Sequence, residues 1–306
     1  MRNELAVVVV AILGAGCGGG SSPNAQAADA ASNQQEAGAP LPYCTSKPPL
    51  TSVTDLSGTW VARLAGSQHV RALGTDLYPM SVGYILVTIS QSGTAIVADG
   101  RYCDRIEKDP PGSLVPVVIP DKWAHTEKPV HRTGTFVAGS DGVPLFTLDP
   151  SVEVAGAVLA DPNDPLPTKP TDLTVIDEDN DGHPGITIDT AGIAPGSMYS
   201  VQRQTTSAVG IPVAADRIEG VLSYLSSQVV LESDPASLAT LYAAGTTLPD
   251  LTACDSTFAM VKVEDAPVTG SADGGDVDGG GAIGSAIDAG AITCSWVRAN
   301  ETVLFP

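Results

Sequence analysis

The sequence predicts an all-β protein, an antiparallel β-barrel or sandwich with one short helix near residues 235–244. Two observations lead to this fold class. Short runs rich in valine, isoleucine, threonine and tyrosine recur along most of the chain, and glycine, proline and aspartate separate them. Their regular spacing favours a barrel or a sandwich over β-α-β units.

Each expected strand is a run of this kind. The first, SGTWVARLA, begins with a serine–glycine pair, and residues 90–93 (SQSG) predict a hairpin turn between the second strand and the third. The expected strands, in chain order, are 57–65, 82–90, 93–99, 114–119, 133–139, 151–159, 184–190, 198–207, 217–232, 256–264 and 293–304.

One segment carries helix signals instead. Asp234 can cap a helix and Gly245 can end it. Leu238, Leu241 and Tyr242 then share one face at helical spacing. We expect this face to pack against the core.

Two segments have loop composition. Residues 161–172 contain four prolines, and we expect a long rigid connection there, with a domain boundary as the alternative. Residues 265–291 consist mainly of glycine, alanine and aspartate, and we expect a disordered insertion between the last two strands.

The N-terminus carries the clearest targeting signal. An apolar run, Leu5–Leu13, is much shorter than the roughly 20 residues that span a bilayer, and it ends in small residues before Cys17. The sequence LGAGC resembles the lipobox of bacterial cell-envelope lipoproteins. This resemblance implies that residues 1–16 are a signal peptide and that Cys17 is lipidated.

The same resemblance implies an outer-membrane lipoprotein that faces the periplasm or the cell surface, with a plainly secreted protein as the alternative. Residues 17–42 contain almost no large apolar side chain, so we expect a disordered tether. Residues 43–306 then form a single all-β ectodomain, held at the membrane by the lipid on Cys17.

The charge of the chain excludes one class of partner. Lysine and arginine number 15 against 35 aspartates and glutamates, a formal net charge of −20. Nucleic acids require clustered positive charge, so we expect none as a partner. A strongly acidic surface also keeps an exported protein soluble.

Apart from Cys17, the chain holds four cysteines, an even number that predicts two disulfides in an oxidising compartment. Three connectivities are possible. We expect nearest-in-sequence pairing, which joins Cys44 to Cys103 and Cys254 to Cys294. The spacings contain no C-x-x-C motif, so neither redox catalysis nor a zinc site is indicated.

The sharpest local motif is an acidic turn. The segment DEDNDGH resembles the first half of EF-hand and integrin-repeat calcium loops, because alternate carboxylates converge on one cation while a glycine permits the sharp turn. The resemblance implies that Asp177, Asp179 and Asp181 supply side chains and that His183 supplies its backbone carbonyl. Asp189 falls one place after the usual last ligand, and a bulge would bring it in. We expect structural Ca²⁺, with a plain acidic turn as the alternative.

A second resemblance lies at the start of the first strand. Gly58-Thr59-Trp60 is similar to the G-x-W opening of lipocalins and avidins, in which a tryptophan closes one end of a barrel. The resemblance implies that an arginine of the last strand packs across this ring, and Arg298 is the candidate. A core tryptophan in an unrelated β fold is the alternative.

No catalytic motif is present: the chain lacks G-x-S-x-G, H-E-x-x-H and a Walker loop. We therefore expect a non-enzymatic binding or structural module of the envelope, with a small apolar ligand or an envelope protein as partner. The alternatives are a lipocalin-like carrier of a small apolar ligand and an envelope hydrolase.

Overall fold

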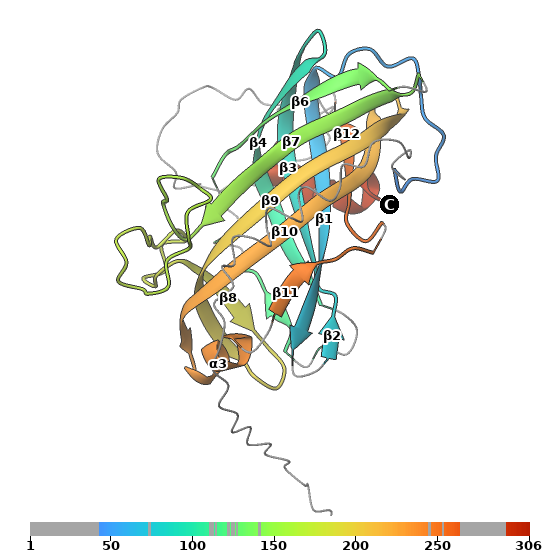
Figure 1. Ribbon diagram of the computed structural model, residues 1–306. Helices are drawn as coiled ribbons and strands as arrows, with labels where there is room; N and C mark the ends of the chain where they lie inside the picture. The colour runs from blue at the N-terminus through green and yellow to red at the C-terminus, as the bar shows by residue number, and fades with distance from the viewer. Residues whose placement is uncertain are drawn as a thin grey trace, which may run out of the picture. The chain divides into compact units, whose positions relative to one another are not determined.

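A closed antiparallel barrel forms the centre of the protein. Eight of the described strands build it: β1 (Gly58–Ala72), β3 (Met80–Ser92), β4 (Ala95–Lys108), β6 (Val130–Ala138), β7 (Pro144–Ala155), β9 (Gly196–Ala214), β10 (Arg217–Asp234) and β12 (Thr257–Lys262). Each pairs with the next in this order, and β12 returns to pair with β1, which closes the ring (Figure 1). The prediction of an all-β fold is confirmed, and the sheet is a barrel.

The computed structural model describes residues 43–306 except 73–74, 110–112, 114, 121–122, 124–125, 127, 140–141, 244–245, 253 and 264–291. The chain from Leu41 to Pro306 forms one compact unit. Three expected features therefore lie outside the described residues: the signal peptide with Cys17, the tether and the insertion 265–291.

Short elements extend the barrel beyond one end of the ring. They are β2 (Thr75–Leu77), β5 (Val117–Val118), β8 (Ile186–Thr190), α3 (Ser237–Ala243) and β11 (Thr246–Pro249). The long strand β9 pairs with β8 through its first residues and with β7 through its later ones. In Figure 1, β8, α3, β2 and β11 lie at the same end of the barrel.

The barrel interior changes in character along its axis. Toward the start of β1, large apolar side chains fill it, among them Trp60, Phe146 and Phe258. Beyond this apolar end, inward positions carry polar side chains. A separate apolar cluster of Trp123, Met198 and neighbouring residues then fills the space under β8 and α3.

The predicted helix near 235–244 is present as α3, which begins at Ser237. Leu238 is buried and packs with Tyr242 in the apolar cluster under β8, as the helical spacing indicated. Residues 161–172 belong to the strand-free connection from β7 to β8, within the same compact unit.

The expectation of a terminal strand at 293–304 is wrong, because this segment forms α4 (Cys294–Leu304). Thr293 caps the helix by accepting a hydrogen bond from the Trp296 backbone amide at 3.3 Å. Val297 is fully buried against the outer face of the barrel, on Val61 and neighbouring residues. Because β12 already pairs with β1, the ring closes without a further strand.

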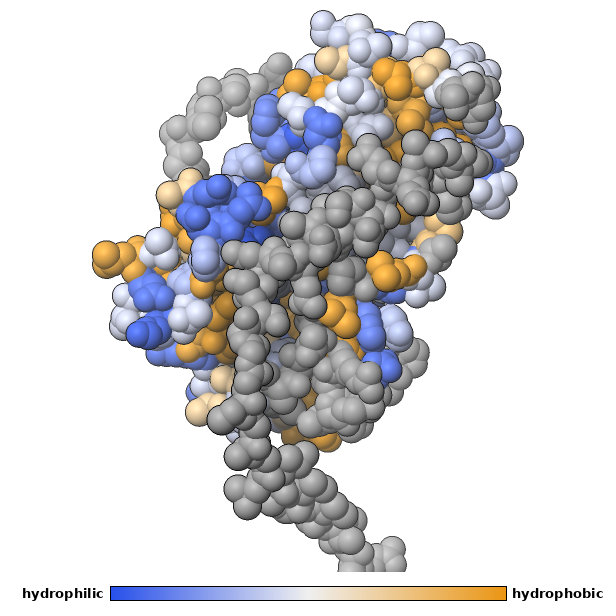
Figure 2. All heavy atoms as spheres, in the orientation of Figure 1, coloured by the Kyte–Doolittle hydropathy of each residue, from blue (hydrophilic) through white to orange (hydrophobic). Residues whose placement is uncertain are grey.

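No helix among the described residues is long and apolar enough to cross a membrane. On the face shown in Figure 2, hydrophobic residues are scattered among hydrophilic ones. The large exposed apolar side chains come from separate parts of the chain, for example Val118, Leu173, Leu251 and Val303. Such scattering is ordinary for a folded protein surface.

Two disulfides are present, but the expected pairing is wrong. Cys44 joins Cys254 with a Cα–Cα distance of 5.3 Å, and Cys103 joins Cys294 with 4.7 Å. The reason is that strand pairing, not separation along the chain, decides which segments meet. The segment before β1 runs along the β9–β10 hairpin, where Leu50 donates to the Pro212 carbonyl. Cys103 lies in the same apolar cluster as Val297 of α4, which brings it close to Cys294.

Candidate metal centre

The acidic turn forms the last part of the β7–β8 connection, shortly before β8. Its backbone needs unusual conformations: φ is 54° at Asn180 and 92° at both Gly182 and Gly185. Gly185 also packs tightly, because a Cβ atom there would lie 2.2 Å from the Ser200 carbonyl oxygen. Glycine is therefore required at this position both for its φ and for lack of space. The turn is thus fixed against β9.

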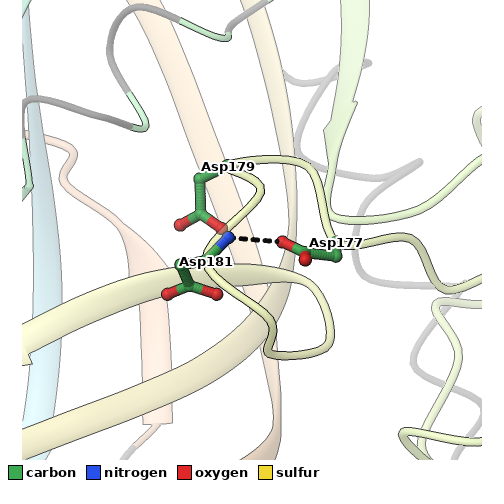
Figure 3. A group of neighbouring side chains, drawn as sticks. All are labelled: Asp177, Asp179 and Asp181. Atoms are coloured by element: carbon green, nitrogen blue, oxygen red, sulfur yellow. Dashed lines mark hydrogen bonds between the residues drawn. The ribbon is translucent and has the colours of Figure 1, made fainter.

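Three carboxylates converge in this turn, as Figure 3 shows. One carboxylate oxygen from each of Asp177, Asp179 and Asp181 lies within 4.8 Å of the others. Asp177 and Asp181 are exposed, whereas Asp179 is buried. The spacing in the sequence therefore brings together the three side chains that it predicts.

Hydrogen bonds hold the two exposed carboxylates in place. The backbone amides of Asp181 and Gly182 donate to the two oxygens of Asp177 at 3.0 and 2.9 Å. Asp181 accepts from the His183 amide at 2.9 Å and from the Thr187 hydroxyl at 2.5 Å. Each ionised oxygen has a second lone pair, so these bonds leave room for a cation.

Asp179 is the most informative of the three. Its side chain is only 2% exposed, and its Oδ2 accepts from the Thr187 amide at 2.9 Å. Its Oδ1 is buried and has no hydrogen-bond partner in the described part of the chain. Desolvation by burial, with the neighbouring charges of Asp181 and Asp177, raises the pKa of Asp179. A bound cation would give Oδ1 a partner and favour the ionised form.

The other two expected ligands are the backbone carbonyl of His183, which stays a prediction, and the side chain of Asp189. The His183 ring stacks on Tyr199, with ring centroids 3.9 Å apart. Asp189 lies on β8, where its Oδ1 accepts from the Ser197 hydroxyl at 2.7 Å, and it is not part of the carboxylate group. The regular pairing of β8 with β9 contains no bulge that would bring Asp189 back to the turn. Thr187 donates to both Asp179 and Asp181, and no sequence motif predicted this role.

The expected contact between Trp60 and Arg298 is replaced by another. Trp60 is buried in the barrel and donates from Nε1 to the Leu56 carbonyl at 2.8 Å. The cation near its ring is Lys262, whose Nζ lies 5.9 Å from the ring centroid. Arg298 lies on α4, outside the barrel, and donates to the Cys103 carbonyl at 2.8 Å. Arg298 was expected on a last strand beside Trp60, and it lies elsewhere because the last segment is a helix.

The fold and the site together define a closed antiparallel barrel that carries an acidic turn beside β8. No protein family matches this chain, and neither curated proteins nor solved structures include a significant match to it.

Proposed function

We propose that the chain is a non-enzymatic binding or structural module of a bacterial envelope, anchored through a lipid on Cys17 and stabilised by one Ca²⁺ ion. The anchor rests on the lipobox resemblance and on the short apolar run before it. The metal rests on the buried, unpartnered Oδ1 of Asp179 within a group of three carboxylates. This atom is the single observation that carries the calcium proposal.

Calcium suits the turn for two physical reasons. It is a hard cation that takes six to eight oxygen ligands in flexible geometry, so waters can complete a set of three carboxylates. It also offsets the mutual repulsion of three adjacent negative charges. With no fourth carboxylate in the group, we expect weak affinity, with a Kd on the order of 1 mM, as in extracellular calcium modules.

The test is thermal unfolding of residues 18–306, a chain that keeps the whole compact unit beginning at Leu41. Calcium at about 10 mM should stabilise the wild type by about 1.4 kcal/mol, a melting shift of a few degrees. Asp179→Asn should abolish this shift and also the calcium binding seen by titration calorimetry.

Asp189→Asn is the matched control, because Asp189 belongs to the resemblance but lies outside the carboxylate group. This variant should keep the calcium shift. If the wild type melts at the same temperature in calcium and in EDTA, the acidic segment is only a turn.

The carrier alternative has one observation in its favour, a cavity that opens between β6, β7 and β9.

A further inference from the structure

A cavity of about 350 Å³ opens into the polar part of the barrel. Tyr102 and Arg105 of β4, Glu153 of β7, and Gln202 and Gln204 of β9 contribute to its wall. A smaller void of about 20 Å³ shares three of these residues and continues toward Thr206 and Tyr224. The two voids adjoin at these shared residues, and we call the pair the recess. Ligand sites in proteins commonly have volumes of about 300–1,000 Å³.

The wall of the recess mixes apolar residues, such as Val130, Val154 and Leu159, with polar ones that the strand pattern directs into the barrel. Inward positions at the apolar end carry residues such as Phe146 of β7, whereas farther along the barrel the strands β4 and β9 carry Arg105, Gln204 and Thr206. These three side chains are at most 8% exposed. Burying polar groups in a barrel costs stability unless they find partners. The recess is therefore a place where the chain departs from a simple apolar core.

Two ion pairs lie around the recess, and Arg105 in its wall lies over the Tyr102 and Trp123 rings, 5.7 and 4.9 Å from their centroids. Arg132 donates to Glu153 at 2.6 Å and to the Thr206 carbonyl at 3.2 Å. On the rim, Lys128 lies 3.7 Å from Glu178. An ionic ligand would have to compete with these pairs, whereas an uncharged ligand leaves them intact.

Two hydrogen-bonding groups in the recess have no partner among the residues that the structure describes. Gln202 donates through its amide nitrogen to the Ser226 hydroxyl at 2.9 Å, and its amide oxygen is buried and unpaired. Turning the amide over would only exchange the unpaired oxygen for an unpaired nitrogen. Deeper in the recess, the Thr206 hydroxyl is also buried and unpaired.

We propose that this recess binds a small, uncharged, hydroxyl-bearing molecule of about monosaccharide size. A hydroxyl both donates and accepts, so it can satisfy the Gln202 oxygen and the Thr206 hydroxyl alike. An apolar ligand would leave both groups unpaired, which is unfavourable. The inference deepens the binding-module proposal and rests on it, but it does not depend on calcium.

The experiment is saturation-transfer difference NMR on residues 18–306 with D-glucose, D-galactose and N-acetyl-D-glucosamine as probes. At least one sugar should bind. Gln202→Leu should weaken that binding about tenfold or more, because the variant loses a buried polar partner. Thr206→Val, which changes the side-chain volume little, should weaken it in the same direction.

Gln228→Leu is the matched control, since Gln228 is exposed and faces Gln202 across the β9–β10 pair without lining the recess. This variant should bind the sugar as the wild type does. The proposal is overturned if no sugar binds, if Gln202→Leu binds as well as the wild type, or if only the apolar probe N-phenyl-1-naphthylamine binds.

Calcium is tested in the same samples without sugar, by melting in calcium and in EDTA. If a sugar binds but calcium does not shift the melting temperature, the recess proposal stands and the calcium proposal is overturned. If calcium shifts the melting temperature but no sugar binds, the calcium proposal stands and the recess proposal is overturned.

Discussion

Two glutamates show how the surroundings of a carboxyl group set its charge in this protein. Burial opposes ionisation of Glu219, but hydrogen bonds from Lys47, Thr45 and Arg217 outweigh it and lower its pKa to about 2. Burial dominates at Glu107 and raises its pKa to about 7, against the opposing effect of Arg105. The first group stabilises the fold when ionised, and the second when protonated.

Glu107 therefore makes stability depend on pH. Its folded pKa lies above the unfolded value of 4.5, so the folded state holds the proton more tightly between about pH 4.5 and 7. Its contribution is fully present below pH 4.5 and is lost as the pH rises through 7. This loss amounts to at most about 3 kcal/mol.

Glu107→Gln should remove this pH dependence, because the amide stays neutral. Relative to the wild type, the variant should gain stability between pH 4.5 and pH 8, measured by urea unfolding at both values. The reverse sign would mean that Glu107 is ionised in the folded protein at low pH. Equal pH dependence of the two proteins would exclude a raised pKa.

At the scale of the elements, the acidic turn depends on its glycines in different ways. Gly182 and Gly185 both have φ of 92°, which is strained for any other residue. A Cβ atom at Gly182 meets nothing within 4 Å, whereas one at Gly185 meets the Ser200 carbonyl oxygen. Substituting each glycine in turn therefore distinguishes the cost of backbone strain, which both share, from the cost of crowding, which only Gly185 has.

Gly185→Ala should destabilise the protein by at least about 2 kcal/mol more than Gly182→Ala does, because β8 must move away from β9. Gly182→Ala should cost about 1–2 kcal/mol, from backbone strain alone. Urea unfolding of the two variants checks the difference. Equal losses would show that the turn can shift away from Ser200 freely.

The elements also show what the sequence could predict and what it could not. The expected strands other than 293–304 overlap observed ones, because alternating or β-branched runs between turn residues are local signals. The helix α4 had local signals as well: Thr293 as a cap, and Val297 and Leu304 seven residues apart on one face. A β-rich composition nearby outweighed them in the prediction.

Long-range features had no local signal. The acidic turn was predictable because its three carboxylates lie close together in the sequence. The burial of Asp179 and the contact from Thr187 arise only when β8 pairs with β9. The polar recess was not predicted either, since inward glutamines such as Gln202 and Gln204 look in sequence like solvent-facing ones.

At the scale of the molecule, the two disulfides connect the ends of the described chain to the barrel. Cys44–Cys254 closes a loop of 210 residues and ties the segment before β1 to the chain before β12. Cys103–Cys294 closes one of 191 residues and fastens α4 to β4. The loops overlap in sequence, so their effects on the unfolded chain are not additive.

This connectivity predicts a definite set of cross-linked peptides. Trypsin cuts after Arg101 and Arg105, which isolates Cys103 in a tetrapeptide, and after Lys262 and Arg298, which isolates Cys294. Mass spectrometry without reduction should find the peptide 102–105 joined to 263–298. A link from 102–105 to the peptide that holds Cys44 would instead restore nearest-in-sequence pairing.

The stability of the whole chain should follow from the same bond. Replacing Cys103 and Cys294 by alanine together should lower the free energy of unfolding by up to about 5 kcal/mol, because the unfolded chain regains the entropy of a long loop. Replacing Val297 by alanine with both disulfides intact should cost about 1–3 kcal/mol, from lost packing of α4 on the barrel. Urea unfolding measures both. If replacing the two cysteines lowers the free energy of unfolding no more than Val297→Ala does, the disulfide contributes no stability beyond the packing of α4 on the barrel.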